Sequence, residues 1–445
     1  MHIPRPPPKP SDAAKQQGAN LMIHRPPWLD PFLSEANAGY YYWDKLQHRP
    51  LPSDVTPEVA WLLVHSSRMA QRTELPLVDP EGRSFGFCLP SKVLETLHWV
   101  DRRRGILPGT DEDGATSLDA LKAHVAVSSL IDEAIATSQI EGAATTRKVA
   151  KDMLQSNRKP RDRSERMIVN SYQTMQRLRD RLDRPLTIAL LFEIQESMTR
   201  DTLDEPDCVG RFRSSEDDIA VVEVSEHRVL FVPPPAEQLP GRMKRLVDFA
   251  NEESTGDSFI HPLVKAAILH FWLAYEHPFV DGNGRTARAI FYWFMLKHRY
   301  SFFEFLTVSR VIRDARVQYY NSFLHTENDH RDVTYSILFM LRATLRAFGV
   351  LDKYLQEKQA EQSSVAAILR KFSNLNPRQR EVFAHAATHP SELCTFQSHA
   401  RAHKITLMTS RSDLLGLVDR GLFAETGRER PREFFVAKKW IGVHV

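Results

Sequence analysis

The 445-residue chain has few cysteines, little net charge and no long apolar run. Its three cysteines, Cys88, Cys208 and Cys394, are too few and too scattered for a disulfide framework or a zinc site. We therefore expect a reducing compartment, the cytoplasm. The formal charge of +3 is small for this length, so the overall charge does not indicate a nucleic-acid-binding protein.

No apolar stretch approaches the length of a bilayer-spanning helix, so we expect no membrane partner. The first ten residues lack the apolar core of a secretory signal, and residues 1–19 are expected to form a flexible proline-rich tail. Hydrophobic residues make up 42% of the chain, with seven tryptophans and 24 phenylalanines. This content favours two or three globular domains with substantial cores.

Hydrophobic spacing divides the rest of the chain into three regions. Residues 20–110 contain aromatic runs and two helical stretches, near 57–74 and 90–104. We call them the N-terminal accessory region, and the sequence does not indicate its role. Residues 111–357 follow mostly helical patterns, and a polar segment at 358–364 is expected to link them to a last domain at 365–445. The predicted fold class is therefore mainly α.

The last domain shows three helical segments at 377–389, 395–403 and 409–420, followed by two strands ending near Val436. Three helices and a hairpin in this order indicate a winged helix, with Thr409 or Ser410 as the cap of its third helix. Winged helices bind DNA or serve as docking and dimerisation modules, so DNA and a homo-oligomer both remain open. The basic residues that suit phosphate contact are Arg401, His403, Lys404, Arg411, Arg428, Arg430 and Arg432.

The most informative stretch of the chain is residues 277–288, HPFVDGNGRTAR. Apolar residues at helical spacing precede and follow it, so two buried helices are expected to meet at this turn. Gly282 and Gly284 permit positive φ and a close backbone approach, and the second helix points its unpaired N–H groups and positive dipole end at a ligand. The turn is therefore an anion site, most naturally for phosphate.

Charged side chains give this turn its chemistry. Arg285 and Arg288 are neighbours on the helix surface and can hold successive phosphate groups. Asp281 suggests Mg²⁺, since magnesium takes one or two carboxylates plus phosphate oxygens. His277, with an ordinary pKa of about 6.5, can accept a proton from a hydroxyl. The set indicates nucleotidyl or phosphoryl transfer, with Phe279 as an apolar anchor of the loop.

The stretch resembles the signature of Fic-domain proteins, His-x-Phe-x-Asp/Glu-Gly-Asn-Gly-Arg-x-x-Arg, at every fixed position. The resemblance implies a helical core that transfers AMP from ATP to a Ser, Thr or Tyr hydroxyl of a target protein and releases pyrophosphate. It implies that His277 is the general base and that Asp281 holds Mg²⁺ against the α- and β-phosphates. It assigns the phosphates to Gly282, Asn283, Gly284, Arg285 and Arg288.

A second segment lies upstream, at residues 137–142, TSQIEG. A helical pattern leads into it, and Gly142 is suited to end that helix, which places Glu141 at the negative end of the dipole, where a carboxylate seeks a cation. The segment resembles the inhibitory pattern Ser/Thr-x-x-x-Glu-Gly/Asn of self-restrained Fic proteins. This implies an ion pair between Glu141 and Arg288 that keeps the guanidinium from the γ-phosphate and misaligns the α-phosphorus.

Two apolar runs at 218–224 and 229–232 flank a polar turn and predict a β-hairpin. An exposed hairpin edge can pair with an extended peptide. The alternative is a hairpin that only packs against the rest of the protein and binds no peptide. The resemblance, which includes residues 210–213 and the proline run at 233–235, implies a flap that docks the target through Val221, Val222, Val224, Val229 and Leu230. A basic run at 147–166 is a solvated face or an attractor of acidic targets.

The leading hypothesis is a self-inhibited protein adenylyltransferase with an appended winged helix. At the same site, Glu141 could instead orient a water for removal of AMP, or the enzyme could transfer another nucleotide-derived group. A hypothesis of another class is a DNA-binding regulator whose Fic-like region senses nucleotide.

Overall fold

A computed structural model describes residues 3–104, 115–223, 228–253, 255–389, 392–427, 431–437 and 440. The chain divides into two compact units, Met1–Gly349 and Val350–Val445. Both units consist mainly of helices with small two- or three-stranded sheets, so the prediction of a mainly α fold is confirmed.

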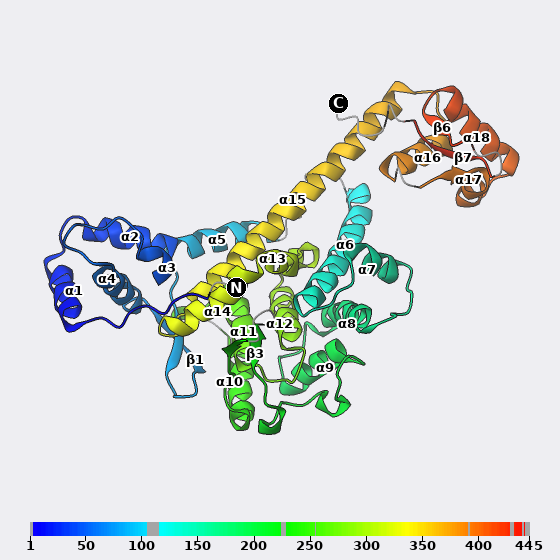
Figure 1. The fold of residues 1–445 in the computed structure, drawn as a ribbon. Coiled ribbons are helices and arrows are strands. Elements are labelled where there is room, and N and C mark those ends of the chain that lie inside the picture. The colour runs from blue at the N-terminus through cyan, green and yellow to red at the C-terminus, as the bar shows by residue number, and fades with distance from the viewer. Residues whose placement is uncertain are drawn as a thin grey trace. The chain divides into compact units, whose positions relative to one another are not determined.

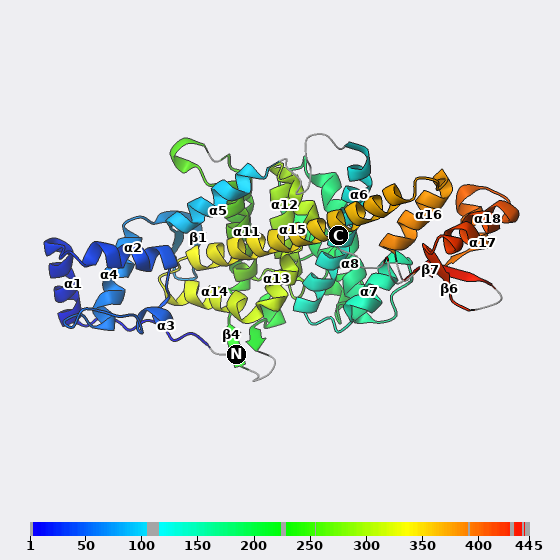
Figure 2. The same cartoon turned by 90° about the horizontal axis from the view of Figure 1, so that it is seen from above.

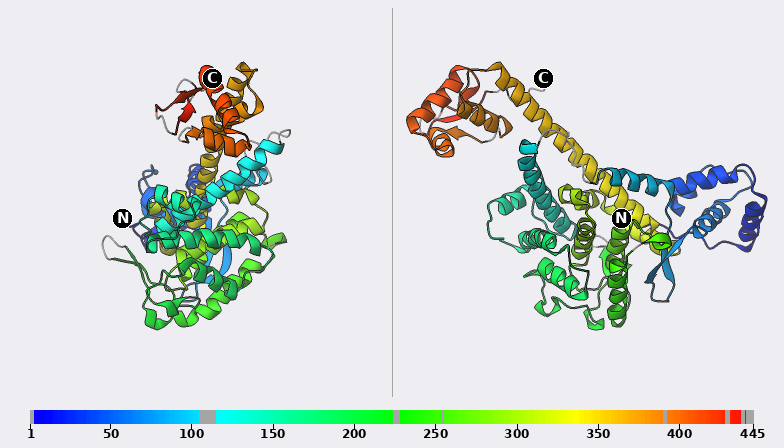
Figure 3. Two further views of the ribbon diagram at one scale, coloured as in Figure 1. Left: turned by 90° about the vertical axis from the view of Figure 1, so that its right-hand side faces the viewer. Right: turned by 180° about the vertical axis from the view of Figure 1, so that it is seen from behind.

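The first unit opens with the accessory region. Its elements are α1 (Asp12–His24), α2 (Leu29–Gly39), α3 (Trp43–Leu46), α4 (Pro57–Met69), β1 (Thr73–Val78), β2 (Ser84–Phe87) and α5 (Ser91–Arg102). α4 packs against α1 and α2, the blue helices in Figure 3. The expected flexible tail is wrong beyond residue 11, because the Ser11 side chain accepts a hydrogen bond from the Ala14 amide at 3.2 Å and starts α1.

The hairpin β1–β2 is absent from the sequence-based prediction, which extends a helix to residue 74. α4 ends at Met69, and β1 pairs antiparallel with β2 across a turn where Gly82 has a φ of 83°. Alternate side chains, Leu75 and Leu77 on β1 and Phe85 and Phe87 on β2, are buried. That period of two was the available signal for a strand.

A buried polar cluster joins the accessory region to the rest of the first unit. Arg68 on α4 donates to the Tyr335 hydroxyl at 3.0 Å, and Tyr335 donates to Asp329 at 2.7 Å. His65 lies 3.2 Å from the other oxygen of Asp329. Because charges out of water are stable only when paired, this cluster ties the two regions together.

The central part of the first unit positions the candidate site. Its helices are α6 (Ala115–Ile140), α7 (Arg147–Gln155), α8 (Arg163–Leu178), α9 (Ile188–Thr199), α10 (Leu239–Asn251), α11 (Pro262–Glu276), α12 (Asn283–Lys297), α13 (Val308–Asp314) and α14 (Arg316–Asn328). The flap strands are β3 (Val221–Glu223) and β4 (Arg228–Phe231), and short 3-10 turns include η3 (Ser215–Asp217) and η4 (Ala236–Gln238).

Two buried helices form the middle of this part. α11 and α12 pack against each other (Figure 1), and nearly every residue of both is buried, as predicted from their apolar spacing. α6 packs against α8 and α13 (Figure 2). The turn between α11 and α12 is therefore held by core helices on both sides.

Helix α15 (Thr334–Lys371) begins in the first unit and ends in the second. The expected linker at 358–364 lies inside it, because glutamate, lysine, glutamine and alanine in this segment favour a helix. An 18-residue window of α15 is apolar enough to cross a membrane by length and composition, but 67% of that window is buried in the protein. Burial of this kind is typical of a core helix.

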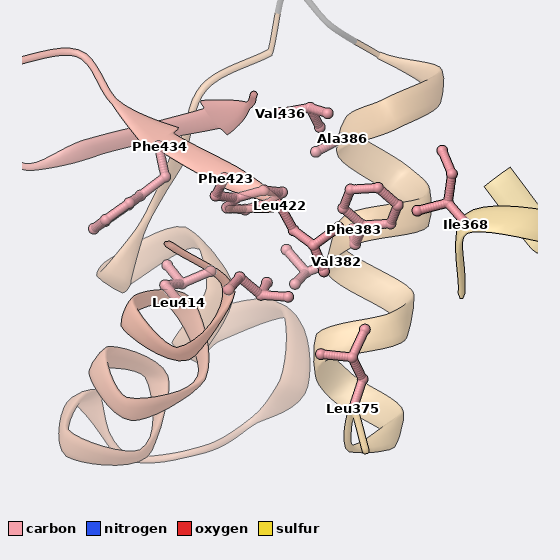
Figure 4. Packing of buried hydrophobic residues seen from close by; sticks show 11 residues of the cluster. Ile368, Leu375, Val382, Phe383, Ala386, Leu414, Leu422, Phe423, Phe434 and Val436 are labelled. Atoms are coloured by element: carbon pink, nitrogen blue, oxygen red, sulfur yellow. The ribbon is translucent and has the colours of Figure 1, made fainter. Parts of the chain in front are cut away.

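The second unit contains α16 (Pro377–Thr388), β5 (Cys394–Thr395), α17 (Phe396–His403), α18 (Leu407–Asp419), β6 (Phe423–Glu425) and β7 (Glu433–Val436). The strands form an antiparallel sheet in the order β5-β7-β6. Figure 4 shows its core, in which Phe383 from α16, Leu414 from α18 and Phe423 and Phe434 from the hairpin are buried together.

The three helices and the two later strands follow the predicted order, but β5 between α16 and α17 was not predicted, and neither was the cap of the third helix. Thr406 caps α18 by accepting a hydrogen bond from the Thr409 amide at 3.2 Å. Ser410 is buried and donates to the Phe396 carbonyl at 2.7 Å. The helix therefore begins earlier than expected, with Leu407 and Met408 exposed on its first turn. Arg428 and Arg430 lie outside the described residues.

Candidate active site

His277 ends α11 in the left-handed conformation, with φ 46° and ψ 54°. Its amide donates to the Leu273 carbonyl at 3.1 Å, which closes the last turn of the helix. Burial lowers the pKa of His277 below its ordinary value, and the nearby Glu141 carboxylate partly opposes this change. The imidazole is therefore mostly neutral at neutral pH, the state that accepts a proton.

A buried arginine, Arg213, holds the corner that carries His277. Its Nε donates to the His277 carbonyl at 2.8 Å, its Nη2 to the Glu276 carbonyl at 3.3 Å, and its amide to the Pro278 carbonyl at 2.8 Å. The last carbonyls of a helix lack partners within it, and a cation is favoured at that end of the dipole. The sequence does not predict that Arg213 supports the end of α11. It indicates only that residues 210–213 are part of the resemblance described above.

A second buried arginine supports the same corner through Glu276. Arg242 on α10 pairs with Glu276 at 2.6 Å, and the Trp272 indole donates to the other oxygen of Glu276 at 3.1 Å. Arg242 also donates to the Val78 carbonyl of β1. Residues 276–278 are therefore held by arginines from two different segments.

The loop between His277 and α12 is closed by its own side chains. Asn283 accepts a hydrogen bond from the Phe279 amide at 2.9 Å and donates to the Phe279 carbonyl at 2.8 Å. The Phe279 ring is fully buried beside Phe192 and Phe212. The side-chain amide of Asn283 is occupied by these bonds within the loop. Asn283 can therefore bind an anion only through its backbone N–H, at the start of α12.

The two glycines of the turn are required for different reasons. Gly282 caps α12 with a φ of 86°, and a Cβ there would lie 2.7 Å from the Thr199 side chain. At Gly284 a Cβ would lie 2.3 Å from a carboxylate oxygen of Glu141. The absence of a side chain at Gly284 therefore lets the Glu141 carboxylate approach the first turn of α12.

Arg288 is held by α6. Its Nη2 donates to Glu141 Oε1 at 2.8 Å and to the Thr137 carbonyl at 3.0 Å, and its Nε donates to the Thr137 hydroxyl at 2.7 Å. The ion pair predicted from the sequence is present, and Gly142 ends this segment with a φ of 96°. The buried Nη1 of Arg288 has no partner among the described residues, so it remains free to bind an acceptor oxygen.

Arg285 has a different set of partners, although its buried Nε has no hydrogen-bond partner among the described residues. It is fully buried and donates to the Met198 carbonyl at 2.8 Å and to Asp281 at 3.0 Å. Arg285 and Arg288 are neighbouring cations on α12, but each has its own carboxylate partner, Asp281 or Glu141. That separate pairing relieves their repulsion within the protein itself.

The donor set fits magnesium only together with phosphate. The Asp281 side chain is about one-third exposed and lies beside the first turn of α12. Among the residues that the structure describes, no three His, Cys, Asp or Glu side chains converge on a common point. One carboxylate next to an anion cradle suits an ion whose other ligands are phosphate oxygens and water.

One pocket is lined by two groups of residues that differ in chemistry. The polar group, the cradle half of the lining, consists of Glu141, His277, Asn283, Gly284 and Arg288. The aromatic half of the lining consists of residues of α11, the flap and one face of α14. They are Val221, Leu230, Phe231, Ala274, Tyr275, Tyr319, Tyr320, Phe323, Leu324 and Glu327.

The flap divides its side chains between two directions. Val221 and Leu230 line the pocket, whereas Val222 and Val229 pair across the strands and are 43% and 53% exposed. Val222 and Val229 are thus accessible to a peptide, while Val221 and Leu230 face the cavity. Val224, assigned to the same docking role, lies outside the described residues.

Half of the eight basic residues in the run at 147–166 are ion-paired. Four of its arginines pair with acidic side chains at 2.6 to 3.6 Å. The pairs are Arg147–Asp132, Arg158–Glu165, Arg163–Asp204 and Arg166–Asp201. This neutralisation favours the solvated face over an attractor of acidic targets.

Comparison with known proteins agrees with this geometry. Residues 185–295 match the model of the Fic/DOC family. A protein adenylyltransferase Fic of Nematostella vectensis is 34% identical over 146 residues, 33% of this chain and 29% of that protein. The adenylyltransferase fic-1 of Caenorhabditis elegans is 39% identical over 98 residues, 22% of this chain and 18% of that protein. The matches thus span less than a third of these relatives.

Solved structures share the fold. A Fic family protein from Desulfovibrio desulfuricans aligns over 78% of this chain and 95% of that one, with a TM-score of 0.50 at 19% identity. A variant fragment of C. elegans Fic-1 aligns over 79% of this chain and 89% of that one, with a TM-score of 0.51 at 19% identity. The corner at 277–288 lies inside residues 185–295, the range that matches the Fic/DOC family model, and Glu141 lies upstream of that range.

Proposed function

We propose that the protein is a self-inhibited adenylyltransferase that moves AMP from ATP to a hydroxyl side chain of a target protein. The observation that carries the proposal is an imidazole, with a pKa lowered by burial, in the same pocket as a glycine-rich helix N-terminus and a buried guanidinium whose Nη1 has no hydrogen-bond partner among the described residues. The adenylyltransferase names of the relatives support the choice of AMP.

The residues have distinct roles in this reaction. The N–H groups at the start of α12 bind phosphate oxygens, as helix N-termini do. His277 takes the proton of the target hydroxyl, whose oxygen bonds to the α-phosphorus as the bond to the β-phosphate breaks and pyrophosphate leaves. Asp281 would hold Mg²⁺, which supplies positive charge against the phosphates.

The Glu141 carboxylate restrains this reaction. It lies over Gly284 and binds Arg288, so a negative group of the protein competes with phosphate for the cradle and for the guanidinium. A triphosphate that binds beside it is displaced from the in-line pose. A displacement of the order of 1 Å lowers a rate about a hundredfold.

Labelling with α-labelled ATP and magnesium tests the proposal. We expect Glu141→Ala to label itself or lysate proteins about a hundredfold more strongly than the parent chain, and Glu141→Ala with His277→Ala to lose the label. Glu196→Ala, on the exposed face of α9, is the matched control and should behave as the parent. Equal labelling of all four proteins, or of none, would contradict the assignment.

The position of Glu141 also supports a second candidate, removal of AMP from a modified target. Its carboxylate lies in the same pocket as His277, where it can orient a water. An AMP-modified target distinguishes the two activities. Release of AMP by the parent chain but not by Glu141→Ala favours removal, whereas release by neither excludes it.

For the second unit we propose contact with double-stranded DNA through α18. Residues 365–445 contain 13 lysines and arginines against 7 aspartates and glutamates, a net charge of +6, whereas the whole chain carries +3. Arg401, Lys404 and Arg411 are exposed around the start of α18. A cluster of cations at a helix that can enter the major groove favours phosphate contact.

A mobility-shift assay across a salt series tests this contact. We expect Arg411→Ala to weaken binding and to reduce the salt dependence by about one phosphate contact. Arg200→Ala, an exposed arginine of the first unit, is the matched control. The absence of a shift at low salt would contradict the contact and favour a docking module for proteins.

A further inference from the structure

The aromatic half of the active-site pocket contains one carboxyl group, that of Glu327. It lies on α14, one turn after Phe323 and Leu324, which line the same wall. Glu327 makes no hydrogen bond or ion pair with any described residue. An unpaired acidic group that is mostly out of water is costly, so its presence in a cavity points to a ligand.

The surroundings of Glu327 hold few groups that affect its charge. α11 contributes the Tyr275 hydroxyl, and α14 itself contributes Tyr319 and Tyr320. The flap contributes only apolar side chains, and Glu141, His277 and Arg288 belong to the cradle half of the lining. Burial is the cause of the change in the pKa of Glu327, with no charged neighbour among the described residues contributing. Burial raises the pKa of Glu327 to about 8. The carboxyl is therefore mostly neutral at pH 7.

The division of the pocket limits what can reach Glu327. If the phosphates of a nucleotide lie at the start of α12, as in the proposed function, the base extends into the aromatic half. Aromatic side chains there offer faces for stacking, which stabilises any base by about 1–3 kcal/mol without choosing among them. Glu327 is the carboxyl group of that half, and its pattern of donors and acceptors changes with protonation, which a tyrosine hydroxyl near neutral pH does not do.

We propose that Glu327 selects the nucleobase, and that its neutral form selects adenine over guanine. A neutral carboxyl has one donor and one acceptor, which match an adenine ring nitrogen and the adjacent exocyclic amine. An ionised carboxylate has only acceptors, which match the two adjacent N–H donors of guanine. This inference rests on the proposed placement of the phosphates.

The two protonation states give opposite dependences on pH. Binding of an adenine nucleotide is complete below the pKa of Glu327 and is lost as the pH rises through it. Binding of a guanine nucleotide increases over the same interval. One pH unit above the pKa about a tenth of the groups remain neutral, so adenine affinity should fall about tenfold relative to low pH.

The experiment measures ATP and GTP binding by calorimetry, with magnesium and without a target protein, from pH 7 to 9. The full-length Glu141→Ala protein is used because its Arg288 is released. It is compared with the same protein carrying Glu327→Gln, whose amide has the donor and acceptor of the neutral acid at every pH. Other titrating groups, including His277 and the γ-phosphate, are common to both proteins.

We expect the ratio of ATP to GTP affinity in the Glu141→Ala protein to fall at least tenfold across this interval, and to stay constant once Glu327→Gln is added. Glu327→Ala should bind both nucleotides with little preference at any pH.

An identical pH dependence with and without Glu327→Gln would overturn base selection, even if labelling succeeds. A pH-dependent ratio without any AMP transfer would instead overturn the proposed function and leave base selection intact. Failure of every form to bind nucleotide would overturn both.

Discussion

The corner at 277–288 and the segment at 137–142, for which we propose an inhibitory role, are held in opposite ways. Within the corner, Asn283 bonds the backbone of Phe279, and Arg213 bonds the carbonyls of three successive residues. The segment at 137–142 contacts the corner chiefly at Arg288, which donates to the Glu141 carboxylate and to the hydroxyl and carbonyl of Thr137. The difference teaches that the corner is held by bonds to its backbone, whereas its contact with the upstream segment centres on one arginine side chain and can be removed by substitution.

The largest effect is expected when a contact that holds the corner at 277–288 is removed. Arg213→Ala leaves carbonyls at the end of α11 without a buried partner, at a cost of about 1–3 kcal/mol for each. We expect transfer by the Glu141→Ala protein to fall about a hundredfold through kcat, because His277 loses its position. Arg213→Lys should recover part of the rate.

Rates at saturating ATP, with the melting temperature measured in parallel, test this expectation. A change in KM alone would assign Arg213 to nucleotide binding and contradict a positioning role.

A smaller effect is expected when one contact of the restraint is removed. Thr137→Val deletes the hydroxyl that accepts from Arg288 Nε at 2.7 Å but leaves Glu141 in place. A single hydrogen bond to a charged group contributes about 1.5–3 kcal/mol. We expect the Thr137→Val protein to be labelled more strongly than the parent chain and less strongly than the Glu141→Ala protein. Labelling equal to the parent's would show that Glu141 alone provides the restraint.

The smallest effect concerns the pH profile of the corner. Burial lowers the pKa of His277, and the Glu141 carboxylate opposes that change. A neutral imidazole is the active form, so activity falls as the pH drops through this pKa. Removal of Glu141 should therefore move the acid limb of kcat/KM to lower pH. Profiles of the parent and Glu141→Ala from pH 5 to 8 measure the shift, and an opposite shift contradicts the coupling.

Local patterns predict most of the corner but not its supports. The spacing of apolar residues predicts α11 and α12, and the glycines predict the anion turn, because each depends on neighbours in the sequence. The Asn283 bonds to Phe279 are local, whereas the Arg213 bonds to the end of α11 depend on how distant segments pack. No local pattern in the sequence predicts the contact between Arg213 and α11. The weak signal was Arg213 itself, which lies in the segment 210–213, 64 residues before His277.

The same distinction explains the errors elsewhere in the chain. The polar segment at 358–364 resembles a linker in composition, yet its residues favour the helix that α15 forms there. The hairpin β1–β2 shows its alternation over only a few residues, and the helix before it obscures the boundary. The start of α18 differs from the prediction because two equally good caps, Thr406 and Thr409, lie three residues apart.

The polar cluster of Arg68, Tyr335 and Asp329 has a consequence for how this protein can be shortened. Asp329 directly follows α14, the helix that supplies one wall of the pocket at the corner. A fragment that starts after residue 104 would leave that buried carboxylate without Arg68, and the pocket wall would lose this support. We therefore expect removal of the accessory region to destabilise the pocket, so that the region cannot be deleted as an independent module.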